Sequence, residues 1–278
     1  MTISIGWFST GQDEAARHLL TAAMEAIQRG ELDGRIAFVF CNRERGEHEA
    51  TDVFLDLVES YGLPLMAMSS RSFRRARGGA LSKPGEPLPA WRHEYDSRVA
   101  ELVAPYPFDI GVLAGYMLIF TEEMCERYPL LNLHPAEPGG PAGTWQEVIW
   151  ELMERRAQRS GAMLHLATRH LDEGPPVTYC LFSLRGPAFD PLWQEIGDRS
   201  IEQVRETEGE ENRLFKEIRR RGAARELPLV VATLRAFADG RVRIEGGSVF
   251  AGEREVEGGY DLTPEIDAAV APLLSGQG

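Results

Sequence analysis

The first half of the chain alternates short apolar runs with segments whose apolar residues recur at helical spacing. Residues 35–41 are apolar almost without interruption, which predicts a strand buried on both faces of a sheet. Asp13 and Glu14 open a stretch with apolar residues three and four positions apart, which predicts a helix ending near Gly30. The predicted strands are residues 3–8, 35–41, 63–68, 109–113 and 130–133, and the predicted helices are residues 13–30, 50–61, 90–104 and 121–127.

The second half carries clear helix signals. Thr144, followed three residues later by Glu147, predicts a capping box at the start of a helix. Residues 200–222 have acids early and bases late, which predicts one surface helix. Further predicted elements are strands at residues 162–167, 177–184 and 241–245 and a helix at residues 227–237.

This order of elements is typical of an α/β fold. We expect a doubly wound, mostly parallel sheet with helices on both faces, followed by C-terminal helices and a short strand. Residues 1–262 are assigned to this single domain, and residues 263–278 to a short C-terminal helix and tail.

The charge and the cysteines narrow the class of protein. A formal net charge of -13 over 278 residues argues against a nucleic-acid or anionic-membrane partner and favours small-molecule substrates. Cys41, Cys125 and Cys180 are far apart in the sequence, so we expect buried, reduced thiols and no metal site. With no secretory signal and no apolar run long enough for a bilayer, the expected location is the cytoplasm.

One segment is locally basic. Residues 70–89 are rich in glycine and proline and are predicted to form a loop. The loop is predicted either to be solvated or to attract a phosphate or carboxylate of a substrate. Its basic residues are Arg71, Arg74, Arg75, Arg77 and Lys83.

Candidate chemistry lies at predicted strand ends, where wound sheets bind ligands. Alternation along a strand puts Asn132 and His134 on the same side of the chain. An amide and an imidazole together suit acyl transfer. Asp172, if folded against His134, would either raise the pKa of the imidazole or accept a proton from an attacking amine. Taken alone, these residues also fit a satisfied strand end and an ordinary turn.

The remaining histidines give no comparable signal. His18, His48 and His93 are predicted to be solvated. His165 and His170 flank a predicted strand without an obvious set of metal ligands.

Several motifs occur together in one order. They are Val112-Leu-Ala-Gly-Tyr-Met117, Leu131-Asn-Leu-His-Pro135, Leu171-Asp-Glu-Gly-Pro175 and a C-terminal stretch at residues 228–240. In this combination the chain resembles the folate-dependent formyltransferases, and most of all the glycinamide-ribonucleotide formyltransferases of purine biosynthesis. The resemblance extends over most of the sequence.

The resemblance implies an enzyme that transfers a formyl group from 10-formyltetrahydrofolate, as cosubstrate, to an amine such as glycinamide ribonucleotide, without a metal. It assigns catalysis to Asn132, His134 and Asp172. The folate-binding residues that it implies are Leu113, Ala114, Gly115, Tyr116, Met117, Leu118, Thr168, Arg169, His170 and Leu171. The residues implied for the amine substrate are Ser9, Thr10, Gly11 and Gln12.

The chain departs from the pattern of the enzymes that it resembles at two loops and at Leu118, which stands where an arginine is often found. The first reads Ser9-Thr-Gly-Gln-Asp-Glu14 in place of a glycine-rich loop, and residues 136–143 replace a loop rich in leucine and proline. Three alternatives therefore stand beside the main hypothesis: a formyltransferase for another amine, a formyltetrahydrofolate hydrolase, and a non-catalytic folate- or nucleotide-binding module. Because the predicted fold starts at residue 3, without the N-terminal regulatory domain usual in such hydrolases, the transferase is the expected activity.

Overall fold

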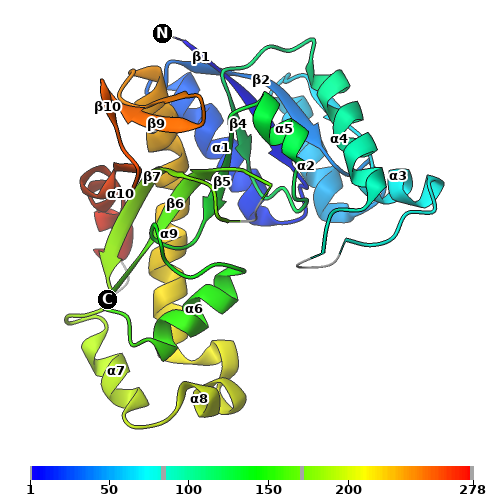
Figure 1. Ribbon diagram of the computed structural model, residues 1–278. Coiled ribbons are helices and arrows are strands. Elements are labelled where there is room, and N and C mark those ends of the chain that lie inside the picture. Colours follow the sequence, from blue (N-terminus) through cyan, green and yellow to red (C-terminus); the bar gives the residue numbers. More distant parts are fainter. Residues whose placement is uncertain (1, 83–85, 170–171, 276–278) are drawn as a thin grey trace.

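The computed structural model describes residues 2–82, 86–169 and 172–275, which form an eight-stranded central sheet with flanking helices (Figure 1). All of the described neighbouring strands run parallel except β6, which is antiparallel to both β5 and β7. The mostly parallel sheet that the sequence predicted is therefore confirmed. In sheet order the strands are β11 (Tyr260–Asp261), β7 (Pro176–Ser183), β6 (Arg159–Leu166), β5 (Leu130–His134), β4 (Ile110–Leu113), β1 (Ile3–Ser9), β2 (Gly34–Cys41) and β3 (Leu65–Ala67).

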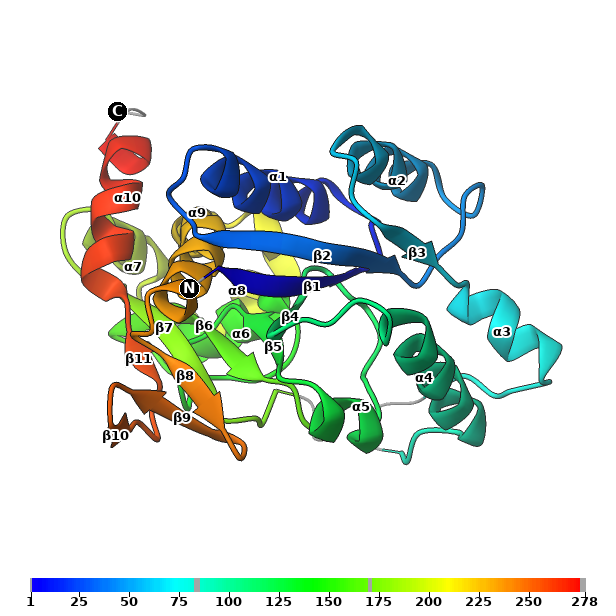
Figure 2. The ribbon, with the colours of Figure 1, turned by 90° about the horizontal axis from the view of Figure 1, so that it is seen from above.

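Helices cover both faces of this sheet, as Figure 2 shows. Trp7 of β1 packs in one cluster with Leu20 of the first helix. The next residue, Phe8, points to the opposite face and packs in a cluster with Tyr95. Strands buried on both faces were predicted and are confirmed. One face carries α1 (Glu14–Gln28), α2 (Glu49–Ser60) and α9 (Arg213–Ala238), and the other carries α4 (Ala90–Val103) and α5 (Glu122–Arg127).

The strand order reverses between β1 and β4. From β1 the chain passes outward to β2 and β3, then returns to β4 on the other side of β1 and continues to β5. The loops after β1 and β4 therefore leave the sheet side by side, which makes the crevice where wound sheets bind ligands.

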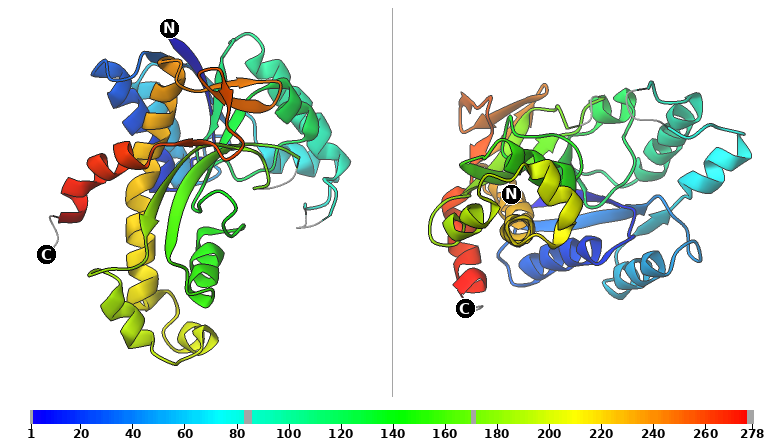
Figure 3. Two further views of the ribbon diagram at one scale, coloured as in Figure 1. Left: turned by 60° about the vertical axis from the view of Figure 1, so that its left-hand side comes forward. Right: turned by 90° about the horizontal axis from the view of Figure 1, so that it is seen from below.

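A second group of helices extends from the start of β6 and the end of β7. It lies at the bottom of Figure 1 and of the left-hand view of Figure 3. We call this group the helical lobe. It consists of α6 (Trp145–Glu154), α7 (Asp190–Ile196), α8 (Ile201–Thr207), the 3₁₀ turn Gly209–Glu211 and the N-terminal part of α9. The lobe has an apolar cluster of its own that includes Trp150, Trp193 and Phe215. The capping box predicted at Thr144 and Glu147 is confirmed at the start of α6.

The helix predicted at residues 200–222 is wrong. The chain forms α8, turns, and then starts α9 at Arg213, where the Asn212 side chain accepts hydrogen bonds from the N–H groups of Leu214 and Phe215. α9 then continues through Gly222 and Pro228, so the helix predicted separately at residues 227–237 is its second half. Burial at both ends, in the helical lobe and against the sheet, outweighs the local cost of glycine and proline.

The loop predicted at residues 70–89 is also partly wrong, because α3 (Ser70–Ala76) is a helix. The Ser69 side chain caps it by accepting a hydrogen bond from the Ser72 N–H, a signal hidden within a run of serines. The last predicted basic residue, Lys83, lies outside the described residues.

The remaining elements lie after α9. β8 (Arg243–Glu245), β9 (Ser248–Ala251) and β10 (Arg254–Glu255) form a small antiparallel sheet, and α10 (Thr263–Ser275) places Ile266 and Val270 in the main core. Cys41 and Cys180 are buried free thiols, as predicted, but Cys125 is only half-buried. None of the helices in the described ranges has the length and apolar character that crossing a membrane requires.

Candidate active site

The pairing of β5 with β6 builds one wall of the candidate site. Asn132 and His134 lie on one face of β5, as their alternation predicted, and Asn132 stands directly opposite His165 of β6. The Asn132 Nδ2 atom lies 3.2 Å from His165 Nε2. The His134 and His165 rings are 6.2 Å apart and nearly perpendicular, so two imidazoles share this wall.

Asp172 completes the group from the segment between β6 and β7. Its Oδ1 accepts a hydrogen bond from Asn132 Nδ2 at 3.3 Å and lies 3.6 Å from His165 Nε2, while its Oδ2 lies 3.8 Å from His134 Nδ1. The structure thus brings together the three residues assigned to catalysis. Asp172 has a φ of 57°, a conformation that is strained for a non-glycine residue and that recurs at functional sites.

The hydrogen bonds define how the two imidazoles are protonated. His134 Nε2 donates to the carbonyl of Pro141 at 2.8 Å, which leaves Nδ1 to exchange a proton on the side of Asp172. His165 Nδ1 donates to the carbonyl of Leu166 at 3.0 Å, so a neutral His165 accepts at Nε2 from the Asn132 amide. His165 thereby fixes which way the Asn132 amide points.

The carboxyl of Asp172 is held in its ionised form. Burial by itself raises its pKa, but the nearby His165 and His134 rings and the backbone N–H of Gly143 together lower the pKa below its ordinary value. A carboxylate that stays charged beside an imidazole can accept a proton from a substrate amine or water.

This shift predicts how stability depends on pH. Because the folded pKa of Asp172 is lowered, its contribution to the free energy of unfolding is present above the ordinary value of 3.8 and is lost as the pH falls through the folded value. We expect the carboxyl carbon of Asp172, followed by NMR, to titrate below pH 3.8 in the folded protein. Titration of this carbon above pH 3.8 would contradict the arrangement.

The loop after β5 closes over the site. Besides the Pro141 carbonyl, it brings the backbone N–H of Gly143 toward the Asp172 carboxylate, whose pKa this N–H lowers. Gly143 has a φ of 101°, and a Cβ there would lie 2.6 Å from the carboxylate of Glu147 in the capping box. The loop at residues 136–143 therefore places backbone groups beside both His134 and Asp172.

The loops at the strand-order reversal are tied to each other. Three hydrogen bonds join them: Ser9 Oγ donates to Ala114 O (2.7 Å), Thr10 N–H donates to Gly115 O (3.1 Å) and Met117 N–H donates to Thr10 Oγ1 (2.9 Å). Residues 113–118, predicted to hold folate, thus lie beside residues 9–12, predicted to hold the amine substrate.

Within the first loop, the polar groups are largely committed to the loop itself. Ser9 Oγ also accepts from the Gly11 N–H at 3.0 Å, and the Ser9 and Thr10 side chains are buried. Gln12 accepts a hydrogen bond from Arg43, which follows β2 and which no sequence motif indicated. The two hydroxyls therefore shape the loop, and Arg43 is a cation in direct contact with it.

The other residues predicted to bind folate are arranged less tightly. Met117 is more than half exposed, and Arg169 extends to Glu122 at 3.0 Å. Thr168 is half-buried beside it, while His170 and Leu171 lie outside the described residues.

His165 is the residue that sequence reasoning missed. Its position seven residues before Asp172 was visible, but its role depends on β6 running antiparallel to β5. A parallel β6, which the wound pattern favoured, would not place Asn132 and His165 opposite each other in this register. Among the described residues there is no group of three side chains suited to a metal ion. His165 makes hydrogen bonds through both ring nitrogens.

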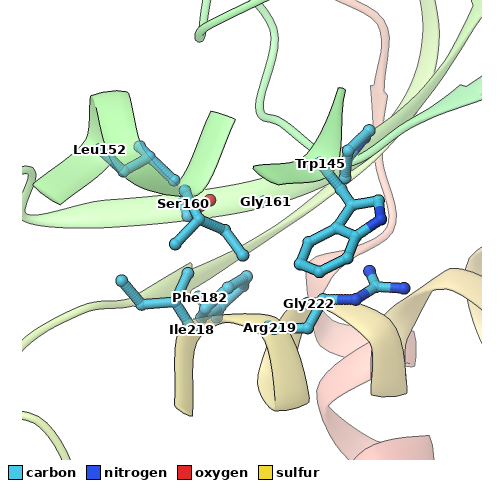
Figure 4. A pocket seen from close by; sticks show the side chains of 10 residues that line it. Trp145, Leu152, Ser160, Gly161, Phe182, Ile218, Arg219 and Gly222 are labelled. Atoms are coloured by element: carbon cyan, nitrogen blue, oxygen red, sulfur yellow. The ribbon is translucent and has the colours of Figure 1, made fainter. Parts of the chain in front are cut away.

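A small cavity with mostly apolar walls lies between α6, β6, β7 and α9 (Figure 4). Pro135, Trp145 and Phe182 are among its walls, and its volume is about 10 Å³. That volume holds at most one water molecule, so this cavity takes no substrate.

Comparison with known proteins identifies the family. The profile described as formyl transferase matches residues 13–180, which is more than half of the chain and includes Asn132, His134, His165 and Asp172. The chain belongs to the formyl transferase family. Most of the helical lobe and all of α9 of this formyl transferase lie beyond the matched region.

Relatives of two kinds resemble this formyl transferase. Formyltetrahydrofolate deformylase of Escherichia coli (strain K12) is 28% identical over 160 residues, covering 57% of the chain and 48% of the relative, so the match spans about half the length of that enzyme. Phosphoribosylglycinamide formyltransferase of the same strain is 23% identical over 245 residues, covering 87% of the chain and 92% of the relative.

A solved structure supports the same fold. The phosphoribosylglycinamide formyltransferase of Coxiella burnetii, in complex with CHES, superposes with a TM-score of 0.64 at 18% identity and covers 94% of the chain and 99% of that protein. At this identity the similarity establishes the fold of the formyl transferase chain and nothing about its substrate.

Proposed function

We propose that this protein transfers the formyl group of 10-formyltetrahydrofolate to a substrate amine, in the first place glycinamide ribonucleotide. The observation that carries the proposal is the convergence of the buried His134 with the partly buried Asn132 and Asp172 at a strand end of a formyl transferase fold. A binding module without catalysis has no need for an ionised carboxylate held beside two imidazoles. The expected setting, purine biosynthesis in the cytoplasm, follows from this substrate.

In the proposed reaction the amine nitrogen attacks the formyl carbon. The attacking amine gives a proton to Asp172, whose lowered pKa keeps it available as a base. His134, protonated at Nδ1, and the Asn132 amide stabilise the developing oxyanion. The bond from the formyl carbon to the donor nitrogen then breaks, and that nitrogen takes up the proton.

The structure adds one requirement to this scheme. Both N–H groups of the Asn132 amide are near acceptors, His165 Nε2 and Asp172 Oδ1. Donation to an oxyanion therefore requires one of these contacts to be released. Proton uptake by Asp172 weakens it as an acceptor, so the proton transfer itself would free the amide.

A folate analogue is expected to bind beside the paired loops. An apolar site at strand ends, with backbone groups as hydrogen-bond partners, suits a pterin ring and its polar edge. We expect hydrogen exchange of residues 113–118 and 168–172 to slow when 5,10-dideazatetrahydrofolate is present at saturation. Exchange unchanged in both segments would refute the folate assignment, whereas residues 248–251 of the small sheet serve as an internal control.

A second candidate function is hydrolysis of formyltetrahydrofolate, with water in place of the amine. Two observations favour it. The chain matches formyltetrahydrofolate deformylase over 160 residues. The first loop is also poorly suited to bind a phosphate. The Ser9 and Thr10 hydroxyls are engaged, and the helix that follows begins with Asp13 and Glu14. Carboxylates in the first turn oppose a bound phosphate.

The two functions are separated by their products. Purified protein is incubated with 10-formyltetrahydrofolate alone, with glycinamide ribonucleotide, and with a panel of unphosphorylated amines. Formylated amine without formate release supports the transferase. Formate released at the same rate with and without amines establishes the deformylase, and transfer only to unphosphorylated amines changes the acceptor.

The source of positive charge for a phosphorylated acceptor is also testable. α3 projects beyond β3, at the edge of the sheet opposite to β6 and β7 (Figure 2), whereas Arg43 contacts Gln12 of the first loop. We expect Arg43→Gln to raise KM for glycinamide ribonucleotide about tenfold, more strongly at low salt. The matched control Arg75→Gln, on exposed α3, is expected to leave KM unchanged. If Arg75→Gln raised KM and Arg43→Gln did not, the positive charge would come from the basic segment at residues 70–89.

A further inference from the structure

An arginine-lined cavity lies where the end of β7 and the first half of α9 meet α10, and none of its lining residues belongs to the candidate active site. Its volume is about 390 Å³, within the range of small-molecule sites. It is partly open to solvent and is bordered by the end of β7, the segment between β7 and α7, α9 and α10. Its lining residues are Phe182, Ser183, Arg185, Pro187, Ala188, Phe189, Arg221, Arg225 and Asp267.

The lining carries an excess of positive charge in an acidic protein. Three arginines face one carboxylate, that of Asp267, whereas the chain as a whole has a formal net charge of -13. Local charge of the opposite sign to the whole molecule attracts anions specifically to this place.

Arg225 is the central feature, because its guanidinium is almost entirely buried. Nη1 donates to the Arg221 carbonyl at 3.0 Å and Nη2 donates to Asp267 at 2.8 Å. The Nε–H group is buried and has no hydrogen-bond partner among the described residues. A buried, unpaired donor on a charged group is costly unless something accepts from it.

Arg185 and Arg221 are each held in place by contacts that do not use all of their guanidinium N–H groups. Arg185 donates through Nε to Gln158 and through Nη2 to the Arg156 carbonyl, and its guanidinium lies 4.7 Å from the Trp193 ring. Arg221 donates through Nε to Glu217. Both side chains are therefore positioned in advance, which lowers the entropy cost of binding an anion.

Aromatic surfaces accompany these charges. The guanidinium of Arg225 lies 4.7 Å from the Phe182 ring, and that of Arg221 lies 5.2 Å from the Phe189 ring. With Pro187 and Ala188, these rings make an apolar wall beside the positive one. Guanidinium groups suit the paired oxygens of a carboxylate or phosphate, and the rings suit an apolar body.

We propose that this cavity binds a small organic anion, with its carboxylate or phosphate held by Arg185, Arg221 and Arg225 and its apolar body against Phe182 and Phe189. The site is separate from the one that performs formyl transfer. Phe182 also borders the small cavity that Pro135 lines, so the anion site adjoins the packing behind His134.

The test uses phenyl phosphate, benzoate and inorganic phosphate as probes at constant ionic strength, with binding followed by calorimetry and by hydrogen exchange. We expect phenyl phosphate or benzoate to bind more tightly than inorganic phosphate and to slow exchange in residues 182–190 and 221–225. Which of the two binds better identifies the head group. If inorganic phosphate bound as tightly as phenyl phosphate and benzoate, the proposed contact of an apolar body with Phe182 and Phe189 would be overturned.

Variants separate this site from others. Arg185→Gln and Arg221→Gln, which leave the buried Arg225–Asp267 pair intact, are each expected to weaken binding about tenfold. The control Arg213→Gln, exposed on the same helix as Arg221, is expected to bind normally. Asp172→Asn should also bind normally, since loss of binding there would place the anion in the candidate active site. If no probe slowed hydrogen exchange in residues 182–190 and 221–225, the proposal would be overturned.

Discussion

Replacing His134 by alanine is expected to lower turnover about a hundredfold or more while the protein remains folded. The side chain is buried, and its Nδ1 faces the carboxylate of Asp172. Its removal deletes the group that stabilises charge developing on the formyl oxygen. Alanine changes at Asn132 and Asp172 are expected to have effects of similar size, measured as kcat/KM for formyl transfer or release.

Two further variants make this result interpretable. His134→Ala leaves the Pro141 carbonyl without its donor, which is expected to cost about 1–3 kcal/mol of stability. His134→Gln keeps a side-chain N–H that can donate to that carbonyl, so it should be nearly as stable as the wild type. Because a glutamine side chain does not take up or release a proton, this variant should still be inactive. His18→Ala, on an exposed face of α1, is the control and should be fully active. Near-normal turnover of His134→Gln would refute proton exchange at this residue.

Replacing Asp96 by alanine is expected to lower the free energy of unfolding by about 3–5 kcal/mol, because it leaves the buried charge of Arg92 uncompensated. Both side chains are 1% exposed, and the closest atoms of the pair are 3.5 Å apart. Burial raises the pKa of the Asp96 carboxyl, and Arg92 opposes that effect. The change is measured by urea unfolding.

The pair also fixes the segment after the predicted folate loop. Arg92 donates to the Ile119 carbonyl and Asp96 accepts from the Thr121 N–H, both at 2.6 Å. We therefore expect Asp96→Ala to weaken binding of a folate analogue as well. The double variant Arg92→Met/Asp96→Leu removes both charges and should regain much of the stability but not the affinity. A double variant less stable than Asp96→Ala would show that the uncompensated charge is not the cause.

The sequence by itself determined the features that depend on neighbours along the chain. Asp13 and Thr144 mark helix starts because a side-chain cap acts on N–H groups two or three residues away. The apolar runs that became β1 and β2 required no knowledge of their partners. Asn132 and His134 share a face because side chains alternate along any strand, so two of the three proposed catalytic residues were placed together from their spacing alone.

Only the tertiary structure decided the features that depend on segments distant in sequence. His165 joined the site because β6 runs antiparallel to β5, and Pro141 and Gly143 joined it because a loop without a periodic pattern folds over His134. α9 passes through Gly222 and Pro228 because burial at its two ends outweighs local propensity. In each case the deciding free energy comes from contacts between distant residues, which the local sequence pattern does not contain.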